Sequence, residues 1–203
     1  MLSATSLSFS YKKEPILVDV SFQLQAGELL HITGDNGSGK STLLKLVAGL
    51  LNLHVGKISF QEPQPVIQYL NADYNGHYLS QSAFFNVQIW AKLLELEISH
   101  EEIDSLLERW GFVHAWIRRQ MPVCKFSTGM RRKLALLKMF MHPGALLVLD
   151  EPANGIDQHG VKILEELLSK HLQGGGSGLI TGFNLSSFEP LISRTLSLKK
   201  GKA

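Results

Sequence analysis

The fold is decided by the stretch Gly34-Asp35-Asn36-Gly37-Ser38-Gly39-Lys40-Ser41-Thr42. Its first eight residues fit the pattern G-x-x-x-x-G-K-[ST], which forms a phosphate-binding loop when a strand precedes it and a helix follows it. The sequence meets both conditions, with an apolar strand expected over 28–33 and an amphipathic helix over 40–51. The glycines allow successive backbone N–H groups to point towards phosphate oxygens. The positive end of the helix dipole adds to this attraction.

The loop therefore predicts a ligand with a chain of phosphates, and Mg²⁺ as its counterion. We expect the backbone from Gly34 through Asp35, Asn36, Gly37 and Ser38 to Gly39 to surround the phosphates. Lys40 would reach the β- and γ-phosphates, the Ser41 hydroxyl would ligate Mg²⁺, and Thr42 would contact the α-phosphate. The alternative is an ordinary glycine turn followed by a chance Lys-Ser pair.

A second motif ends an apolar run. Residues 145–149 are continuously apolar, as in a strand buried on both faces of a parallel sheet, and Asp150 and Glu151 follow directly. Asp150 can hold Mg²⁺ directly or through water, and Glu151 can orient or deprotonate an attacking water. Two carboxylates after a strand could instead cap a helix, but the phosphate loop upstream favours the catalytic interpretation.

The order of elements predicts an α/β fold. Strands are expected over 2–9, 18–24 and 28–33, and their short turns suggest antiparallel pairing. Further strands are expected over 57–60, 66–70, 179–181 and 194–198, and helices over 84–94, from Ser99, from Ser127 to Met141 and over 160–172. The chain is therefore expected to be one domain, 1–203, with an N-terminal antiparallel β subdomain and an inserted helical subdomain at about 72–125.

Composition excludes several classes of protein. The 203 residues include 20 Lys and Arg against 18 Asp and Glu, so a strongly basic nucleic-acid binder is excluded and no nucleic acid partner is expected. A lone cysteine, Cys124, excludes an intrachain disulfide and a multi-cysteine zinc site, and we expect it to be a small buried residue. No apolar run approaches the roughly 18 residues of a membrane helix, and residues 1–10 lack signal-peptide features. We expect a cytoplasmic chain that reaches a membrane through a partner.

A third motif, Phe126-Ser127-Thr128-Gly129-Met130, precedes Asp150 and is followed by Arg131-Arg132-Lys133. With the other two motifs in this order, the chain resembles the ATP-binding subunits of ABC transporters over nearly its whole length. Their signature at this place is Leu-Ser-Gly-Gly-Gln, of which Ser127 and Gly129 are kept. The resemblance implies that these two residues approach the γ-phosphate, that Tyr11 stacks on adenine, and that Asp157 contacts a second subunit. For Tyr11 the alternative is a tyrosine that merely ends a strand. The three basic residues are expected on a solvated helix face, and a phosphate-facing patch is the alternative.

Two positions depart from that family's pattern. A Gln, or a His in some branches, normally follows the strand at 66–70, where this chain has Asn71-Ala72-Asp73-Tyr74. A His that contacts the γ-phosphate normally follows the strand at 179–181, where this chain has Phe183, with Asn184 next to it. Phe cannot donate a hydrogen bond, so slow turnover is one expectation, and chemistry supplied by a partner is another.

Within the family the chain is most similar to the ATPase of the cytochrome c biogenesis haem exporter. Its short length, the segment with Asn75-Gly76-His77, Leu79-Ser80 and Asn86, and the last strand at 193–198 support this likeness. The likeness implies an ATPase that pairs head to tail with a second nucleotide-binding domain, most simply its own copy, and binds an integral membrane permease. It further implies a peripheral position on the cytoplasmic face of the inner membrane. Phe84, Phe85 and Trp90 are candidates for the permease contact, and helix core is the alternative for all three.

Other classes of function remain open at this stage. A small kinase with a phosphate-binding loop would need a lid and an acceptor site, and the motif at 126–130 so close before Asp150 argues against it. Soluble relatives in DNA repair or translation usually contain two such domains or long insertions. An ATP-gated module of another small-substrate exporter, hydrolysing weakly or not at all, is the main alternative, because of Phe183.

Overall fold

The computed structural model describes residues 2–71, 76–142, 144–182 and 185–199. The strands are β1 (Leu2–Tyr11), β2 (Glu14–Leu24), β3 (Leu29–Thr33), β4 (Val55–Phe60), β5 (Ile67–Leu70), β6 (Leu146–Leu149), β7 (Ser177–Thr181) and β8 (Arg194–Ser197). The α-helices are α1 (Lys40–Val47), α2 (Ala83–Leu93), α3 (His100–Arg109), α4 (Ala115–Arg119), α5 (Thr128–Met139) and α6 (Gln158–Gln173). Short 3₁₀ helices cover Val123–Lys125 and Ser186–Leu191.

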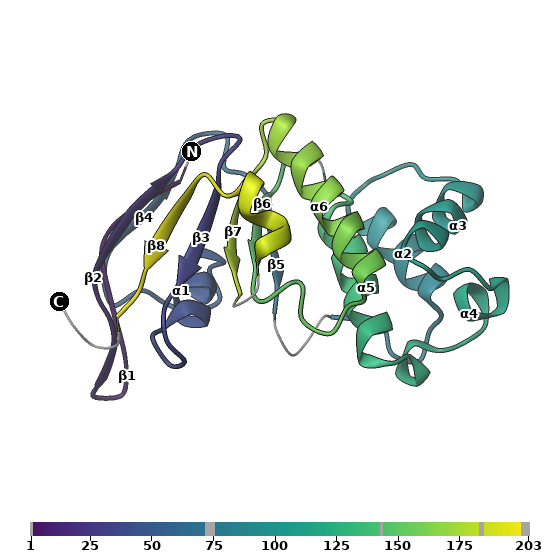
Figure 1. The fold of residues 1–203 in the computed structure, drawn as a ribbon, viewed down its shortest axis with the longest axis horizontal. Coiled ribbons are helices and arrows are strands. Elements are labelled where there is room, and N and C mark those ends of the chain that lie inside the picture. The colour runs from purple at the N-terminus through teal and green to yellow at the C-terminus, as the bar shows by residue number, and fades with distance from the viewer. Residues whose placement is uncertain (1, 72–75, 143, 183–184, 200–203) are drawn as a thin grey trace.

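The strands form two sheets. An antiparallel sheet has the order β2-β1-β4, and a parallel sheet has the order β5-β6-β7-β3-β8. Figure 1 shows the antiparallel sheet at one end of the molecule, the parallel sheet in the middle, and α2, α3 and α4 at the other end. The predicted α/β arrangement with a helical segment after β5 therefore agrees with the structure.

The third strand was expected to pair antiparallel with the first two, and that prediction is wrong. β3 lies between β7 and β8 and runs parallel to both. The chain leaves the first sheet after Leu24 and enters the second one at Leu29, with four residues between the two strands. Both partners of β3 come from the last 30 residues of the chain, so a short turn before it does not indicate a hairpin.

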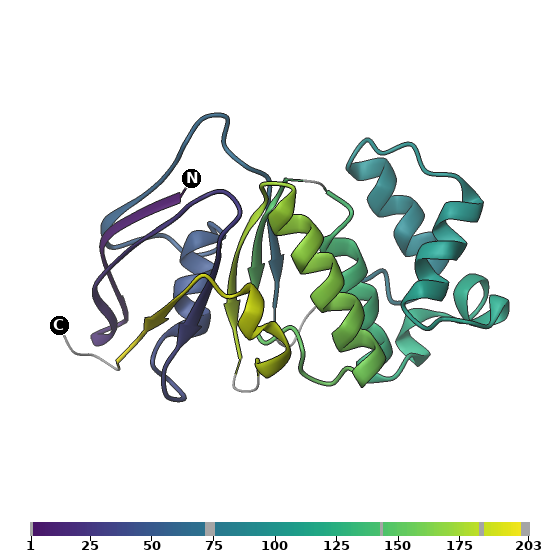
Figure 2. The same ribbon diagram turned by 45° about the horizontal axis from the view of Figure 1, so that its top comes forward.

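Helices cover both faces of the parallel sheet. Leu146 and Val148 of β6 pack with Leu43 of α1 and with residues of the antiparallel sheet, so α1 lies between the two sheets. The alternate residues Leu147 and Leu149 pack with α5 and α6 on the opposite face. Figure 2 shows α6 along this second face. Burial on both faces explains the continuous apolar run that predicted β6.

The helical segment is built from capped helices. Ser82 accepts from Phe85 N at the start of α2, and Ser99 forms the predicted capping box with Glu102 at the start of α3. Asn86 is fully buried and joins α2 to the preceding turn, because its amide bonds both the N–H and the carbonyl of Tyr78.

The three aromatic candidates for a partner contact, and the single cysteine, differ in how far they are exposed. Phe84 and Trp90 belong to the buried core, as their alternative interpretation had it, whereas Phe85 is exposed. Cys124 is exposed, so the expectation of a buried cysteine is wrong. It lies in the 3₁₀ helix after Pro122, where the chain turns from the helical segment towards α5.

Candidate functional site

The phosphate-type loop connects β3 to α1 in a conformation that demands glycine. Gly39 precedes α1 with φ 97°, and a Cβ there would meet Leu17 Cδ2 at 2.7 Å. Gly34 has φ +144°, and a Cβ there would collide with the carbonyl of Leu198 and the hydroxyl of Ser38. The loop is therefore held closely between β2 and the end of β8, with its backbone curled back on itself.

Two polar side chains of the loop itself are placed to bind a ligand there. Lys40 Nζ donates to the carbonyls of Gly34 at 2.7 Å and Asp35 at 3.1 Å, so its ammonium lies over the loop. Ser38 is 1% exposed, and its hydroxyl has no hydrogen-bond partner among the described residues. The first turn of α1 has no acidic residue to offset the helix dipole. A buried hydroxyl unpaired among the described residues, a lysine and a helix N-terminus without a side-chain cap form a cradle that suits an anion.

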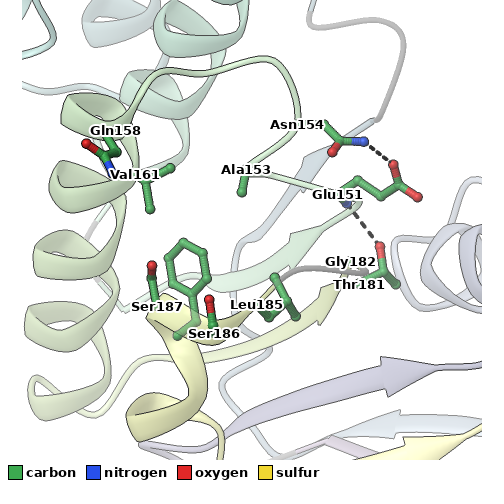
Figure 3. Close-up of a pocket in the computed structure, with 11 residues that line it drawn as sticks. Glu151, Ala153, Asn154, Gln158, Val161, Thr181, Gly182, Leu185, Ser186 and Ser187 are labelled. Atoms are coloured by element: carbon green, nitrogen blue, oxygen red, sulfur yellow. Dashed lines mark hydrogen bonds between the residues drawn. The ribbon is translucent and has the colours of Figure 1, made fainter.

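The carboxylate pair follows β6 as predicted. Leu149 lies opposite Ile180 of β7, so the next residues, Asp150 and Thr181, lie side by side. Thr181 Oγ1 donates to Asp150 Oδ1 at 2.7 Å and accepts the backbone N–H of Glu151 at 3.0 Å. Figure 3 shows the second of these bonds. Sequence reasoning missed Thr181; its signal was a polar residue directly after the apolar Leu179 and Ile180.

The backbone of Glu151 is strained, and its side chain is fixed by a hydrogen bond. Its φ is 49°, a left-handed conformation that is uncommon outside glycine. Asn154 Nδ2 donates to Glu151 Oε2, and Asn154 N donates to the Glu151 carbonyl at 3.1 Å. In Figure 3 these two side chains meet at the rim of a pocket of about 330 Å³ that extends to Leu185. Strain of this kind, stabilised by neighbours, is typical of functional sites.

The signature motif begins α5, where Ser127 caps the helix by accepting from Met130 N at 3.1 Å. A Cβ on Gly129 would meet the Gly155 carbonyl at 2.6 Å, so the first turn of α5 lies directly against the loop that follows Glu151. The signature and the carboxylate loop are thus in contact within one chain.

The Asp157 side chain forms a hydrogen bond and an ion pair within its own chain. Its side chain caps α6 by accepting from Gly160 N at 2.8 Å, and it pairs with Lys133 Nζ at 2.7 Å. The Lys133 ammonium and the Gly160 N–H hold the pKa of Asp157 below its usual value. Whether it also contacts a second subunit stays a prediction.

The expectation of a solvated face for the basic run is wrong for Arg132. Its side chain is 3% exposed, and it donates to the carbonyls of Asp150 at 2.6 Å and Glu151 at 2.8 Å. Arg132 falls on the same helix face as the fully buried Leu136, four residues later. Burial is tolerated here because the guanidinium fork finds backbone acceptors at the end of β6. Sequence reasoning missed this residue. The same expectation is wrong for Lys133, whose side chain is only 12% exposed.

Tyr11 ends β1 and is 46% exposed, with its ring edge-to-face with Phe9 at 4.9 Å. Its ladder partner is Glu14. Two residues further on, Ile16 reaches the position that a Cβ on Gly39 would occupy. The exposed ring is therefore on a hairpin that packs against the phosphate-type loop.

One edge of the parallel sheet gathers most of the candidate residues. β3, β7 and β6 are neighbours and run parallel, so the loop after β3, Thr181 and the carboxylate pair all follow strand ends at that edge. Ligands in open α/β sheets bind outside the carboxyl ends of the strands. The positions discussed above at Ala72, Asp73, Tyr74, Asn75, Phe183 and Asn184 lie outside the described residues.

Over the described residues, no group of three or more His, Cys, Asp or Glu side chains is arranged to hold a metal ion. Of the helices in the described ranges, none has the length and apolarity needed to cross a bilayer.

Comparisons with known proteins agree on one family. Residues 17–154 match the family described as ABC transporter. The cytochrome c biogenesis ATP-binding export protein CcmA of Xanthomonas oryzae pv. oryzae strain MAFF 311018 is 30% identical, over 98% of this chain and 94% of its own length. CcmA of Vibrio vulnificus strain YJ016 is 31% identical over 89% and 91% of the two chains.

Solved structures share the fold. The ATP-binding subunit of an ABC transporter matches with a TM-score of 0.85 and 25% identity, covering 99% of this chain and 87% of that one. A dimeric ATP-binding cassette in a post-hydrolysis state, bound to ADP and phosphate, matches with a TM-score of 0.81 and 16% identity, over 99% and 95%. The fold is that of the ABC-type NTPases with a phosphate-binding loop, and the chain belongs to the ABC transporter family as an ATP-binding subunit homologous to CcmA.

Proposed function

We propose that this chain binds and hydrolyses ATP as the energy-supplying subunit of an exporter that serves cytochrome c biogenesis, with haem as the exported substrate. The observation that supports hydrolysis is the meeting of three features at one sheet edge: the glycine loop, Asp150 bonded to Thr181, and Glu151 held by Asn154. The proposed pathway rests on the likeness to CcmA.

In this proposal the loop from Gly34 to Gly39 binds the phosphates of ATP through its backbone N–H groups and the dipole of α1. Lys40 exchanges its loop carbonyls for β- and γ-phosphate oxygens, which bind an ammonium more strongly because they are charged. The Ser38 hydroxyl, buried and unpaired among the described residues, gains an acceptor. Thr42 is assigned to the α-phosphate, and the exposed Tyr11 ring to adenine.

Mg²⁺ fits the donor set. The ion typically binds through one or two protein oxygens plus substrate phosphates and water, so no all-protein cluster is needed. The residues that would hold it are Ser41 and Asp150, and it would neutralise charge on the transferring phosphate. Thr181 fixes the Asp150 carboxylate for that purpose.

Glu151 acts in this proposal on the attacking water. Its carboxylate accepts a proton from the water as the oxygen attacks the γ-phosphorus, and ADP leaves with the β–γ bridging oxygen. Asn154 holds one carboxylate oxygen and leaves the other one to face the water. The result is ADP, inorganic phosphate and one released proton.

A second copy of the chain completes the site. Ser127 and Gly129 of that copy, at the N-terminus of its α5, approach the γ-phosphate, and Asp157 contributes to the contact. The permease is proposed to rest on the helical segment, where Phe85 is the exposed member of the three aromatic candidates. Closure on ATP and opening after hydrolysis would drive the permease.

Equilibrium ATP binding and size-exclusion chromatography test this assembly. We expect Lys40→Ala to lose ATP binding, and Glu151→Gln with ATP to elute as a dimer, which Ser127→Arg abolishes by placing a bulky cation at the contact. ATP binding that ignores Lys40, or a Glu151→Gln chain that stays monomeric with ATP, would contradict the proposal.

A second candidate is favoured by one sequence observation. Phe183 stands where relatives have a γ-phosphate His, so a clamp that closes on ATP with little or no turnover remains a defined alternative. It predicts normal ATP binding through Lys40, and turnover too low to depend on Glu151.

A further inference from the structure

We infer that Arg132 is a positioning residue for Glu151, acting through the backbone of the carboxylate pair; the inference rests on the proposed hydrolysis. Arg132 is on α5, eighteen and nineteen residues before the pair in sequence. Its guanidinium binds three main-chain carbonyls, those of Asn71, Asp150 and Glu151.

The two carbonyls that follow β6 explain why a guanidinium is needed. Buried backbone carbonyls require partners, and Asp150 and Glu151 lie beyond the last ladder residue of β6, Leu149. The Glu151 carbonyl has one backbone donor, the N–H of Asn154 at 3.1 Å, and Arg132 adds a second. Both carbonyls accept from the same nitrogen, Nη2 of Arg132. The adjacent peptides are thereby fixed from one side by Arg132, while Thr181 fixes the N–H of Glu151 from the other.

This fixation matters because the conformation of Glu151 is strained. Its φ of 49° costs energy for a residue with a side chain. It also determines the direction in which the carboxylate leaves the strand. Losing the Arg132 bond would leave the Glu151 carbonyl with the N–H of Asn154 as its donor, which would allow the backbone to relax towards negative φ and move the carboxylate. A displacement of about 1 Å in a reacting group can cost on the order of 10²-fold in rate.

The third carbonyl extends the arrangement to the segment after β5. Asn71 is the residue directly after that strand, and its carbonyl is bound by Nη1 of the same guanidinium. Arg132 therefore ties together the ends of β5 and β6 from the helix that begins with Ser127 and Gly129. A movement of α5 would reach the Glu151 carbonyl directly through this side chain.

Arg132→Lys tests the inference, with Arg131→Lys as the matched control. Lys keeps the charge but offers a single ammonium on a flexible stem, which cannot reproduce the planar fork. The Arg131 side chain makes no hydrogen bond or ion pair with the described residues, so the same substitution there measures the general cost of changing this helix.

The measurements are kcat for ATP hydrolysis, equilibrium ATP affinity, melting temperature and hydrogen–deuterium exchange of residues 150–154. We expect Arg132→Lys to lower kcat on the order of 10²-fold while ATP affinity stays unchanged, with faster exchange over 150–154. Arg131→Lys should match the wild type in all four measurements. A kcat for Arg132→Lys equal to that of Arg131→Lys would overturn the inference. It would also be overturned if the fall in kcat were fully explained by weaker ATP binding and a lower melting temperature.

The exchange measurement separates this inference from the proposed function. If the wild-type chain does not hydrolyse ATP, the proposed function fails. Hydrogen–deuterium exchange over residues 150–154 then tests by itself whether Arg132 positions Glu151. Faster exchange over 150–154 in Arg132→Lys than in Arg131→Lys would still support its positioning of Glu151, and equal exchange would overturn it.

Discussion

The hydroxyl of Thr181 connects both carboxylate residues of the site: it donates to Asp150 Oδ1 at 2.7 Å and accepts the N–H of Glu151 at 3.0 Å. A hydroxyl has one donor and two acceptor positions, so both bonds can form at once. The bonds follow from the register of β6 and β7, which places the two strand ends side by side. The carboxylate pair is therefore held by a residue that neither the phosphate loop nor the signature motif contains.

Replacing Thr181 by Val should destabilise the fold and slow hydrolysis. Val has nearly the same shape, but it leaves the buried Asp150 carboxylate and the Glu151 N–H without their partner. An unsatisfied buried polar group costs about 1–3 kcal/mol of unfolding free energy. Urea denaturation would measure this cost, with Thr181→Ser as the control that keeps the hydroxyl. A Thr181→Val chain as stable and as active as Thr181→Ser would show that the two bonds are unimportant.

Gly129→Ala should lower stability although alanine is the better helix former. In an exposed helix the change would gain up to about 1 kcal/mol, but a Cβ at 129 meets the Gly155 carbonyl at 2.6 Å. The start of α5 must then separate from the loop after Glu151, which we expect to cost about 1–3 kcal/mol and to reduce turnover.

The control for Gly129→Ala is Gly174→Ala at the end of α6. A Cβ there makes only ordinary contacts, at 3.4 and 3.5 Å. Thermal unfolding of both variants compares them directly. If Gly129→Ala melts at or above the temperature of Gly174→Ala, the close approach of α5 to Gly155 does not constrain the sequence.

His77 should make the chain less stable as the pH falls below 6.5. Burial lowers its pKa to about 4, an effect that the Arg131 carbonyl opposes and the charges of Lys138 and Arg131 reinforce. The unfolded chain binds a proton at its ordinary pKa of 6.5, whereas the folded chain does not until about pH 4. Between these values the unfolded state binds more protons, so protonation favours unfolding as the pH falls.

The size of this effect follows from the difference in pKa. From pH 7 to pH 4.5 it should remove on the order of 2–3 kcal/mol of unfolding free energy. Denaturation curves of His77→Gln, which keeps a donor for the Arg131 carbonyl, should lose that part of the pH dependence. His114→Gln, at an exposed position, should retain it. Equal pH dependence in wild type and His77→Gln would mean that His77 remains protonatable in the folded chain.

Local signals predicted much of this molecule because they have local causes. The buried run before Asp150, the glycine loop with its helix, and the caps at Ser99 and Ser127 each depend on neighbouring residues, and the structure has all of them. They place the phosphate loop and the carboxylate pair on elements of the predicted type.

The features that were wrong or missed depend on distant contacts. β3 pairs with strands near the end of the chain, so its short preceding turn gave a misleading indication. Arg132 is buried because carbonyls from two other strand ends surround it, and a basic run alone predicts a solvated face. Thr181 depends on the register between β6 and β7, which no pattern within either strand determines.

The most direct test of the account is the rate of Mg²⁺-dependent ATP hydrolysis by the purified wild-type chain and by Glu151→Gln. The account predicts measurable phosphate release by the wild type and its loss in Glu151→Gln, with ATP affinity kept because the glycine loop and Lys40 are intact. Hydrolysis that survives in Glu151→Gln, or a wild type that binds ATP through Lys40 without releasing phosphate, would contradict the proposed role of Glu151. The second result would identify the chain as an ATP-gated clamp.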